Sequence, residues 1–325
     1  MRKEDLRIVF MGTPEFAVET LKALVENEYN VVAVVTQPDK AVGRHQTEVQ
    51  PSEVEKYALE HHLPVLQPEK MKDPAFVEQL KSYKANLQVV VAFRMLPEVV
   101  WDMPQYGTFN VHAALLPQYR GAAPINWAVI NGETQTGVTT FFLDKDIDTG
   151  RVIMQKPFAI PDEANVEYVY DGLMHLGAEI CLETLEKIIA SDGYPESIPQ
   201  EELEGKFKRL YEAPKLFKNI CEIDWNRPCK RIYDFIRGLS PYPGAWTSLL
   251  GPNGKMVDLK IFKTTKTEKN VGMKPGTIVV YHGMLYITTG DYMLQIDELQ
   301  MAGRERMKAR DFLNGNKNIE NYIIK

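Results

Sequence analysis

The stretch RIVFMGTPEFAVETLKALVENEYNVVAVVTQ, residues 7–37, decides the fold that the sequence predicts. It opens with an apolar run over 7–11, and residues 14–27 then carry apolar side chains at three- and four-residue spacing. A second apolar run covers 30–37. The outer runs are typical of strands and the middle segment of an amphipathic helix. This order predicts one strand–helix–strand unit of a parallel sheet.

The same alternation continues toward residue 191. The pattern predicts helices over 52–62 and 165–191, and further strands over 87–93, 108–112, 137–144 and 151–158. The run over 87–93 is apolar throughout, as in a strand covered on both faces. We therefore expect an α/β fold with a doubly wound, mostly parallel sheet, whose ligands bind beyond the carboxyl ends of its strands.

The pattern changes after residue 204. Residues 205–218 hold five basic side chains against one acid and show no helical or strand period. One helix, over 229–239, then precedes five short strands separated by Gly and Pro. Short strands at this spacing are typical of a small closed barrel such as the oligonucleotide-binding (OB) barrel. We expect a catalytic domain over 1–204, a basic linker over 205–220 and a C-terminal, OB-like β-barrel domain over 221–325.

Length and composition point to a soluble protein with two domains. The chain has 325 residues, of which 44% are hydrophobic and 25% charged. No apolar run approaches the ~20 residues of a membrane span, and the N-terminus does not resemble a signal peptide. We expect a cytoplasmic monomer with no membrane association. The three cysteines lack metal-ligand spacing, so no metal is expected.

Charge divides unevenly along the chain. Residues 221–325 hold 16 Lys and Arg against 11 Asp and Glu, a balance of +5. The other 220 residues hold 22 against 33, or −11, and the two sum to the net charge of −6. This asymmetry favours a polyanionic partner that contacts mainly the second half, although chance scatter of surface charge explains the count equally well.

The turn after the first strand does not predict a dinucleotide site. Gly12 stands where such a fingerprint begins, but the other two glycines are missing and Pro14 opens the helix. Gly12 instead predicts a tight turn from strand to helix, with Pro14 in the first turn. Thr13 and Pro14 are expected to line the cleft.

The strand over 108–112 ends with an amide and an imidazole. Asn110 and His112 are two residues apart, so their side chains share one face of the sheet. A later turn holds Asp144, Asp146 and Asp148, and any one of these would orient the imidazole and favour its charged form if the turns adjoin. An alternative interpretation makes all of them structural: a turn amide, a buried histidine and a solvated acidic loop.

Such a set suits acyl transfer without a protein nucleophile. An amide and a charged imidazole stabilise the oxyanion of a tetrahedral intermediate and move protons to and from it. No Ser or Cys accompanies them in the motif, so the nucleophile would come from the substrate, for example an amine.

The motifs NVHAALLPQYRGAAPI (110–125) and GVTTFFLDKDIDTG (137–150) resemble the folate-dependent formyltransferases. MGTPEFA, TQPDKAVGR, LPVLQPEK, APKL, IDW and RGLSPYPGAW follow that pattern in order, and the resemblance covers residues 7 to about 315. It implies a Rossmann-like formyltransferase core, 10-formyltetrahydrofolate as donor and the α-amine of methionyl initiator tRNA as acceptor. It assigns catalytic roles to Asn110, His112 and Asp148.

The resemblance also implies binding residues. The folate pocket would include Phe93, Met95, Leu96, Leu115 and Pro117. Arg94 departs from the family pattern and is either a surface charge or a contact for the glutamate tail of folate, and Ala114 replaces the usual Ser. The residues implied to contact tRNA lie in the loop after the second strand and in the linker: Lys40, Arg44, Lys206, Lys208, Arg209 and Lys215.

Two rival functions remain open from the sequence. One is formyl transfer on the same core to another amine, such as glycinamide ribonucleotide or an amino sugar. The other is a non-catalytic protein that binds RNA or folate. The basic linker and the second domain favour tRNA as acceptor, because a small amine needs no such surface.

Overall fold

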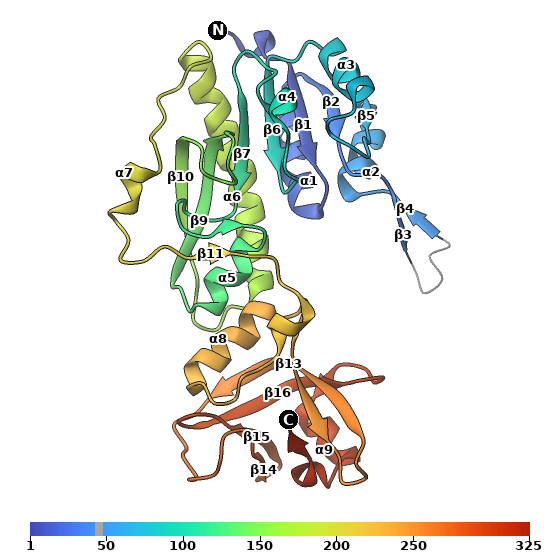
Figure 1. The fold of residues 1–325 in the computed structure, drawn as a ribbon, viewed down its shortest axis with the longest axis vertical. Helices are drawn as coiled ribbons and strands as arrows, with labels where there is room; N and C mark the ends of the chain where they lie inside the picture. Colours follow the sequence, from blue (N-terminus) through green and yellow to red (C-terminus); the bar gives the residue numbers. More distant parts are fainter. Residues whose placement is uncertain (43–47) are drawn as a thin grey trace. The chain divides into compact units, whose positions relative to one another are not determined.

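The computed structural model describes residues 1–42 and 48–325 (Figure 1). The chain forms two compact units. The N-terminal unit comprises Met1–Gly121, Thr136–Ala159 and Tyr170–Glu212. The C-terminal unit comprises Ala122–Gln135, Ile160–Val169 and Ala213–Lys325. Ala122–Gln135 and Ile160–Val169 thus belong to the C-terminal unit, although they precede it in sequence. The domain limits at residues 204 and 220 stay a prediction.

A seven-stranded sheet forms the centre of the N-terminal unit, in the order β10-β9-β7-β6-β1-β2-β5 (Figure 1). The strands are β1 (Ile8–Gly12), β2 (Val31–Val35), β5 (Val65–Leu66), β6 (Leu87–Val91), β7 (Thr108–His112), β9 (Gln135–Phe142) and β10 (Val152–Ala159). β1, β2, β5, β6 and β7 pair in parallel, whereas β9 is antiparallel to β7. The predicted α/β class with a mostly parallel sheet is confirmed.

Helices cover both faces of this sheet. On one face, Phe76, Val77 and Leu80 of α3 pack with Val9 of β1 and Val90 of β6 in one buried cluster. On the other face, helices α1 and α6 lie against β1 and β7 (Figure 1). The helices of this unit are α1 (Glu15–Glu26), α2 (Glu53–Glu60), α3 (Pro74–Ser82), α4 (Glu98–Trp101), α6 (Val166–Ala190) and α7 (Glu201–Glu204).

Local signals explain where several helices begin. The side chain of Ser52 accepts from the amide of Glu55 at the start of α2, and Asp73 accepts from that of Ala75 at the start of α3. Short elements complete this unit and its junction: η1 (Lys3–Asp5), β3 (Lys40–Val42), β4 (Glu48–Gln50), β8 (Arg120–Gly121) and β11 (Glu212–Ala213).

The C-terminal unit is a nearly closed antiparallel barrel with helices packed on it. Its sheet runs β14-β15-β16-β13-β12-β18, and Glu320 beside β18 accepts from the amide of Val280 in β14. The elements are β12 (Ala245–Leu250), β13 (Met256–Lys266), β14 (Ile278–Tyr281), β15 (Met284–Thr288), β16 (Met293–Met301), β17 (Met307–Lys308), β18 (Ile323–Ile324), η2 (Lys218–Cys221), α5 (Pro124–Ile130), α8 (Cys229–Leu239), α9 (Ala309–Gly315) and η3 (Ile319–Asn321). The predicted barrel is confirmed.

The core of this unit includes Ile130 of α5 together with Ile232, Ile236 and Leu239 of α8. The segment that holds α5 therefore belongs structurally with the C-terminal unit, although it lies between two strands of the central sheet in sequence. Within residues 1–42 and 48–325, no helix combines the length and apolar character that crossing a membrane requires.

Candidate active site

Three parallel strands end together at one edge of the sheet. Gly12 pairs with Val91, and Val91 pairs with Val111, so β1, β6 and β7 reach this edge in register. A side chain at Gly12 would place its Cβ 2.6 Å from the Cβ of Ala17 and 3.1 Å from the carbonyl oxygen of Val91. Only glycine therefore fits this turn, as the sequence predicted.

Asn110 and His112 project from β7 on the same face. Val111 between them faces α6, where a Cβ added at Gly177 would lie 3.4 Å from its Cγ1. Successive side chains of a strand alternate, so Asn110 and His112 lie on the opposite face, together with their cross-strand partners Phe141 and Thr139.

His112 is buried and held in one orientation. Its side chain is 6% exposed, and Nε2 lies 2.9 Å from the carbonyl oxygen of Tyr119. A carbonyl oxygen only accepts, so Nε2 carries a proton and Nδ1 is the nitrogen left for other contacts. Nδ1 faces Asp148, with 3.8 Å to its Oδ2. That separation is longer than a hydrogen bond.

Of the three acids in the loop after β9, Asp148 is the one that reaches the imidazole. Asp144 and Asp146 are exposed, and Asp144 folds the loop by accepting from the Asp146 amide and the Thr149 hydroxyl. Asp148 is only 13% exposed, and its Oδ2 accepts from the amide of Gly121 at 2.9 Å.

The turn over residues 148–150, which we call the aspartate turn, has an unusual backbone. Asp148 has a φ of 57°, in the left-handed region that few non-glycine residues adopt. A Cβ at Gly150 would lie 1.7 Å from the carbonyl oxygen of Phe142, so only glycine allows the turn to pack against β9. The packing at Gly150 explains why the turn ends in glycine.

Gln200, which the sequence analysis missed, holds the aspartate turn in place. It is fully buried, and its Nε2 donates to the carbonyls of Asp148 and Gly150, both at 2.9 Å. Its Oε1 accepts from Nε and Nη2 of Arg120, at 3.0 and 2.7 Å. All hydrogen-bonding groups of this amide are engaged. The residue precedes α7 and lies 52 positions after Asp148, so nothing in the local sequence signals its contact.

Asn110 presents an unused polar atom to this site. Its Oδ1 is buried and has no hydrogen-bond partner within residues 1–42 and 48–325. Leaving a buried acceptor without a partner costs about 1–3 kcal/mol, so such atoms are rare away from functional sites. A bound ligand with a suitably placed donor would satisfy it.

The residues expected at the folate pocket differ in exposure. Leu96 and Pro117 are buried, Phe93 and Leu115 are partly buried, and Met95 is 71% exposed. Arg94 is not the free surface charge that one interpretation made it. Its guanidinium is partly buried, which lowers the pKa of the group, and it donates to the carbonyls of Pro68 and Glu69.

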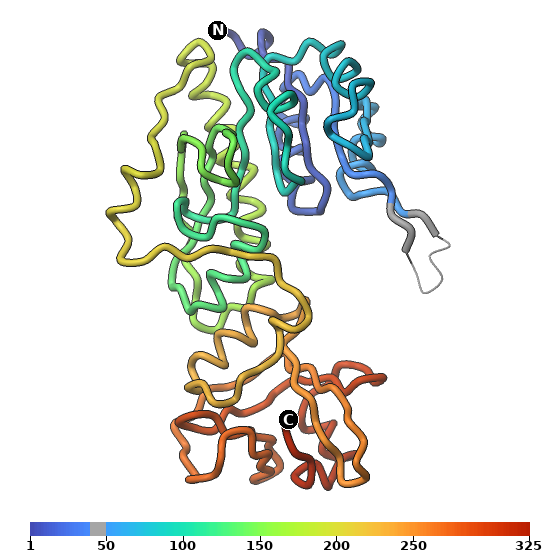
Figure 2. The backbone as a smooth tube through the Cα atoms, in the orientation of Figure 1, coloured from blue at the N-terminus to red at the C-terminus, as the bar shows by residue number. Residues whose placement is uncertain are grey.

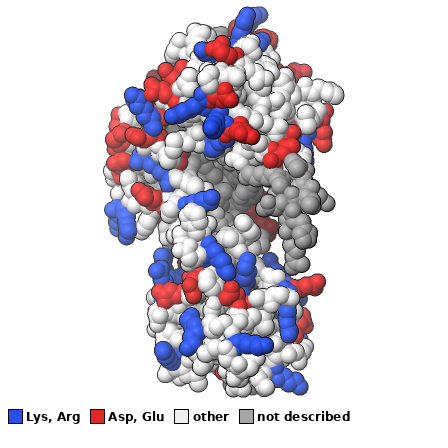
Figure 3. All heavy atoms as spheres, turned by 45° about the vertical axis from the view of Figure 1, so that its right-hand side comes forward, with Lys and Arg blue, Asp and Glu red and all other residues white. Residues whose placement is uncertain are grey.

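The expected tRNA contacts are only partly described. Thr13 lies at the sheet edge, where its hydroxyl accepts from the Gln37 amide at 3.4 Å, and Pro14 is exposed at the start of α1. Arg44 and the side chain of Lys40 fall outside the described part of the structure. The linker cations are exposed: Lys206, Lys208, Arg209 and Lys215. Figure 3 shows further Lys and Arg side chains, interspersed with acids, on the surface of the C-terminal unit.

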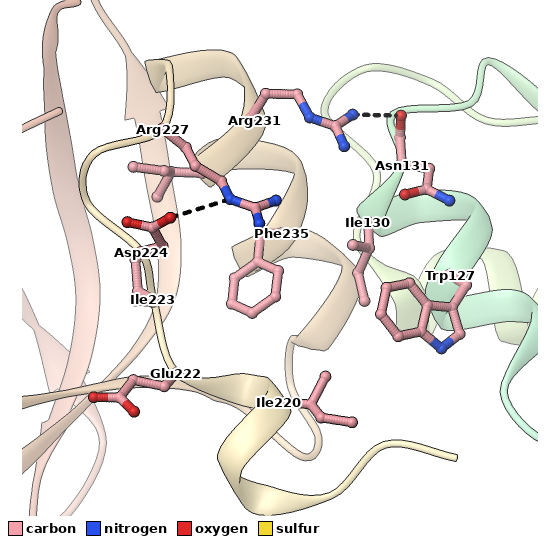
Figure 4. A pocket seen from close by; sticks show the side chains of 11 residues that line it. Trp127, Ile130, Asn131, Ile220, Glu222, Ile223, Asp224, Arg227, Arg231 and Phe235 are labelled. Atoms are coloured by element: carbon pink, nitrogen blue, oxygen red, sulfur yellow. Dashed lines mark hydrogen bonds and ion pairs between the residues drawn. The ribbon is translucent and has the colours of Figure 1, made fainter. Parts of the chain in front are cut away.

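A separate pocket of about 210 Å³ is formed by residues of the C-terminal unit (Figure 4). Trp127 and Ile130 of α5 and Phe235 of α8 give it an apolar wall. Its two arginines already have partners: Arg227 contacts Asp224 at 3.4 Å, and Arg231 donates to the carbonyl of Asn131 at 2.9 Å. None of its lining residues is a histidine or cysteine, so the chemistry is expected at the sheet edge.

The chain belongs to the formyl transferases, because family models match most of its length. Residues 6–185 match the family described as formyl transferase, and residues 215–317 match the formyl transferase C-terminal domain. The structure of HypX from Aquifex aeolicus with tetrahydrofolic acid shares the fold, with a TM-score of 0.61 and 20% identity. That match covers 96% of this chain and 48% of HypX, so the chain spans about half the length of HypX.

Similar curated proteins show to which group within the formyl transferases the chain belongs. The methionyl-tRNA formyltransferase of Parabacteroides distasonis is 56% identical over 325 residues, which is 100% of both chains. The enzyme of the same name from Bacteroides fragilis is 56% identical over 316 residues, or 97% of this chain and 96% of the relative. The chain belongs to the methionyl-tRNA formyltransferase family.

Proposed function

We propose that this chain transfers the formyl group of 10-formyltetrahydrofolate to the α-amine of methionine carried by initiator tRNA. Full-length relatives with 56% identity are named for that activity. The observation that carries the proposal is the pairing of His112 with Asp148 on the face of β7 that also bears the unpartnered Oδ1 of Asn110. A cytoplasmic monomer remains part of the proposal.

Asn110 and His112 are assigned to the developing negative charge. When the amine attacks the formyl carbon, charge moves to the formyl oxygen, and donors fixed in advance at that position lower the barrier. Because the carbonyl of Tyr119 occupies Nε2 of His112, the imidazole donates through Nδ1. The side-chain amide of Asn110 supplies the second donor, while its Oδ1 accepts an N–H of the attacking amine.

Asp148 is assigned two tasks. Its carboxylate faces Nδ1 of His112 and stabilises the positive charge that the imidazole needs as a donor. The carboxylate oxygen beside Nδ1 collects the proton that the attacking amine releases, and this proton passes to the folate nitrogen as its bond to the formyl carbon breaks. The bond from the Gly121 amide keeps Oδ2 beside Nδ1.

The folate donor is assigned to the wall formed by Phe93, Met95, Leu96, Leu115 and Pro117. Two of these side chains are buried and two partly buried, so most of the wall is already packed before a ligand arrives. Met95 is the exception, and its exposed side chain would lose water contact against a bound ring system. No metal is needed for the roles assigned to Asn110, His112 and Asp148.

The acceptor tRNA is assigned to the loop around Lys40 and Arg44 and to the linker cations Lys206, Lys208, Arg209 and Lys215. Exposed lysines and arginines bind phosphates and so position a nucleic acid without reading its sequence. The balance of +5 over residues 221–325 supports phosphate contacts by the C-terminal unit as well.

The decisive experiment compares three acceptors: methionyl initiator tRNA, the same tRNA uncharged, and glycinamide ribonucleotide. Formylation of the first alone supports the proposal, whereas activity only on the small amine would reassign the enzyme to another acceptor.

For the tRNA surface, Lys206→Ala and Lys208→Ala should each weaken tRNA binding and reduce its salt slope by about one. Such point variants are cleaner than deleting 221–325, because that deletion also removes the packing partner of α5.

A further inference from the structure

The loop over residues 119–121, which we call the clamp loop, contacts both His112 and Asp148. The carbonyl of Tyr119 accepts from Nε2 of His112, and the amide of Gly121 donates to Oδ2 of Asp148, both at 2.9 Å. A shift of this loop would therefore change the protonated nitrogen of the imidazole and the direction of the carboxylate together.

The clamp loop does not hold this shape by its own preference. Tyr119 has a φ of 59°, a left-handed conformation that a bulky residue adopts only when its surroundings impose it. Gly121 has a φ of 127°, which is also outside the range of ordinary residues. Neighbouring contacts must therefore fix the loop.

Some of those contacts come from the linker, and others come from Gln200, which accepts two hydrogen bonds from Arg120 of the clamp loop. Figure 2 shows the segment after α7 passing beside the loop that follows β7. Nε2 of Gln118 donates to the carbonyl of Arg209 at 2.6 Å, and Oε1 accepts from the amide of Tyr211 at 2.9 Å. The amide of Tyr119 donates to the carbonyl of Tyr211 at 2.7 Å, and the two tyrosine rings stack with centroids 5.9 Å apart.

The side-chain amide of Gln118 pairs with the linker backbone in the way that a backbone peptide group of a neighbouring strand would. It donates to residue 209 and accepts from residue 211, so both ends of its amide are used. A side chain of similar length without polar atoms would fill the same space and make neither bond. Such a substitution therefore tests the two hydrogen bonds of Gln118 without changing the packing at this position.

We propose that Gln118 is a positioning residue, which ties residues 209–211 of the linker to the clamp loop and thereby fixes the protonation pattern of His112. The inference rests on the proposed function, because it takes His112 and Asp148 as the catalytic pair. It adds that the segment assigned to tRNA phosphates also supports the active site, so that the linker must be seated for turnover.

The kinetic test uses Gln118→Met, which keeps the volume, and Gln118→Ala as a second variant in case one folds poorly. A small misplacement of catalytic groups costs up to about 100-fold in rate, so we expect kcat for formyl transfer to fall roughly 10- to 100-fold in both. KM for folate should stay close to wild type, and any rise in KM for tRNA should be smaller than the fall in kcat. Gln79→Ala, at an exposed glutamine of α3, is the matched control and should leave kcat unchanged.

A spectroscopic measurement on the free enzyme tests the positioning role of Gln118 independently of the proposed formyl-transfer activity. In a sample labelled with ¹⁵N at its six histidines, the ring signals of His112 should report Nε2–H in the wild type and a tautomer mixture in Gln118→Met. A His112→Asn sample assigns those signals, and its full activity would contradict the proposed function instead. Unchanged kcat with unchanged ring signals in both Gln118 variants would overturn the positioning role. A rise in KM for tRNA alone would make Gln118 a tRNA contact.

Discussion

Replacing Asn110 by Ala should separate activity from stability. Removing one oxyanion donor costs about 2.7–4 kcal/mol of barrier, so the rate of formyl transfer should fall roughly 10²- to 10³-fold. The same change deletes an acceptor, Oδ1, that the folded chain buries without a partner within its described residues. The unfolded chain hydrates that atom, so its removal relieves a penalty of about 1–3 kcal/mol that only the native state bears.

The assay pairs single-turnover formylation of methionyl-tRNA with urea unfolding followed by circular dichroism. We expect the free energy of unfolding of Asn110→Ala to equal or exceed that of the wild type. Its rate of formyl transfer should nevertheless fall roughly 10²- to 10³-fold. Asn126→Ala is the matched control, because the Asn126 amide donates to the carbonyl of Gly238 at 2.9 Å in the C-terminal unit. That variant should lose about 1 kcal/mol of stability and keep its rate. If Asn110→Ala lost stability like the control, or kept its rate within tenfold, the reasoning would be refuted.

Three further changes test the supports of the site and the fold. Gln200→Leu should lower kcat and reduce the free energy of unfolding by about 2–4 kcal/mol in urea titrations, because two carbonyls of the aspartate turn lose their donor. Gly150→Ala should cost roughly 3 kcal/mol through overpacking against β9, whereas Gly205→Ala, with no heavy atom within 4 Å of its added Cβ, should be nearly neutral in the same titration. Asp162 is hydrogen bonded to Lys266, which lowers its pKa in the folded state, so its contribution is present at neutral pH and is lost as pH falls through that pKa. Asp162→Asn should therefore be less stable by under ~1 kcal/mol at pH 7, and thermal melts of the two proteins should converge in acid.

Periodicity predicted the central sheet well because its strands are regular and buried. Residues 108–112 form β7 with the predicted limits, and the two-residue spacing of Asn110 and His112 places them on one face. Residue spacing could not predict which of Asp144, Asp146 and Asp148 lies beside His112. That choice depends on the left-handed backbone at Asp148 and on its bond from Gly121, and both arise from tertiary packing.

Elements and contacts that depend on distant partners escaped the sequence analysis. Helices α3 and α5 both begin at a proline, Pro74 and Pro124, which is favourable in the first helical turn but also ends many loops. Gln200 meets the aspartate turn only after the intervening long helix has returned the chain to the sheet. For Arg94 the sequence left open a surface charge or a folate contact, and nothing in the sequence marks its bonds to the backbone carbonyls of Pro68 and Glu69.

Rigidity at this site comes from residues outside the catalytic set, and this explains one departure from the family pattern. Ala114 stands where a serine is usual, yet the loop there is fixed through its backbone: the hydroxyl of Thr139 donates to the Ala114 carbonyl at 2.7 Å and accepts from the Leu116 amide at 3.0 Å. A side-chain hydroxyl at 114 is not required for either bond. Donors that are held before the ligand arrives need no reorganisation as charge develops, which is the condition for strong oxyanion stabilisation. The clamp loop and the aspartate turn meet that condition through Gln118 and Gln200, so loss of these amides should reduce turnover more than loss of any nearby hydroxyl.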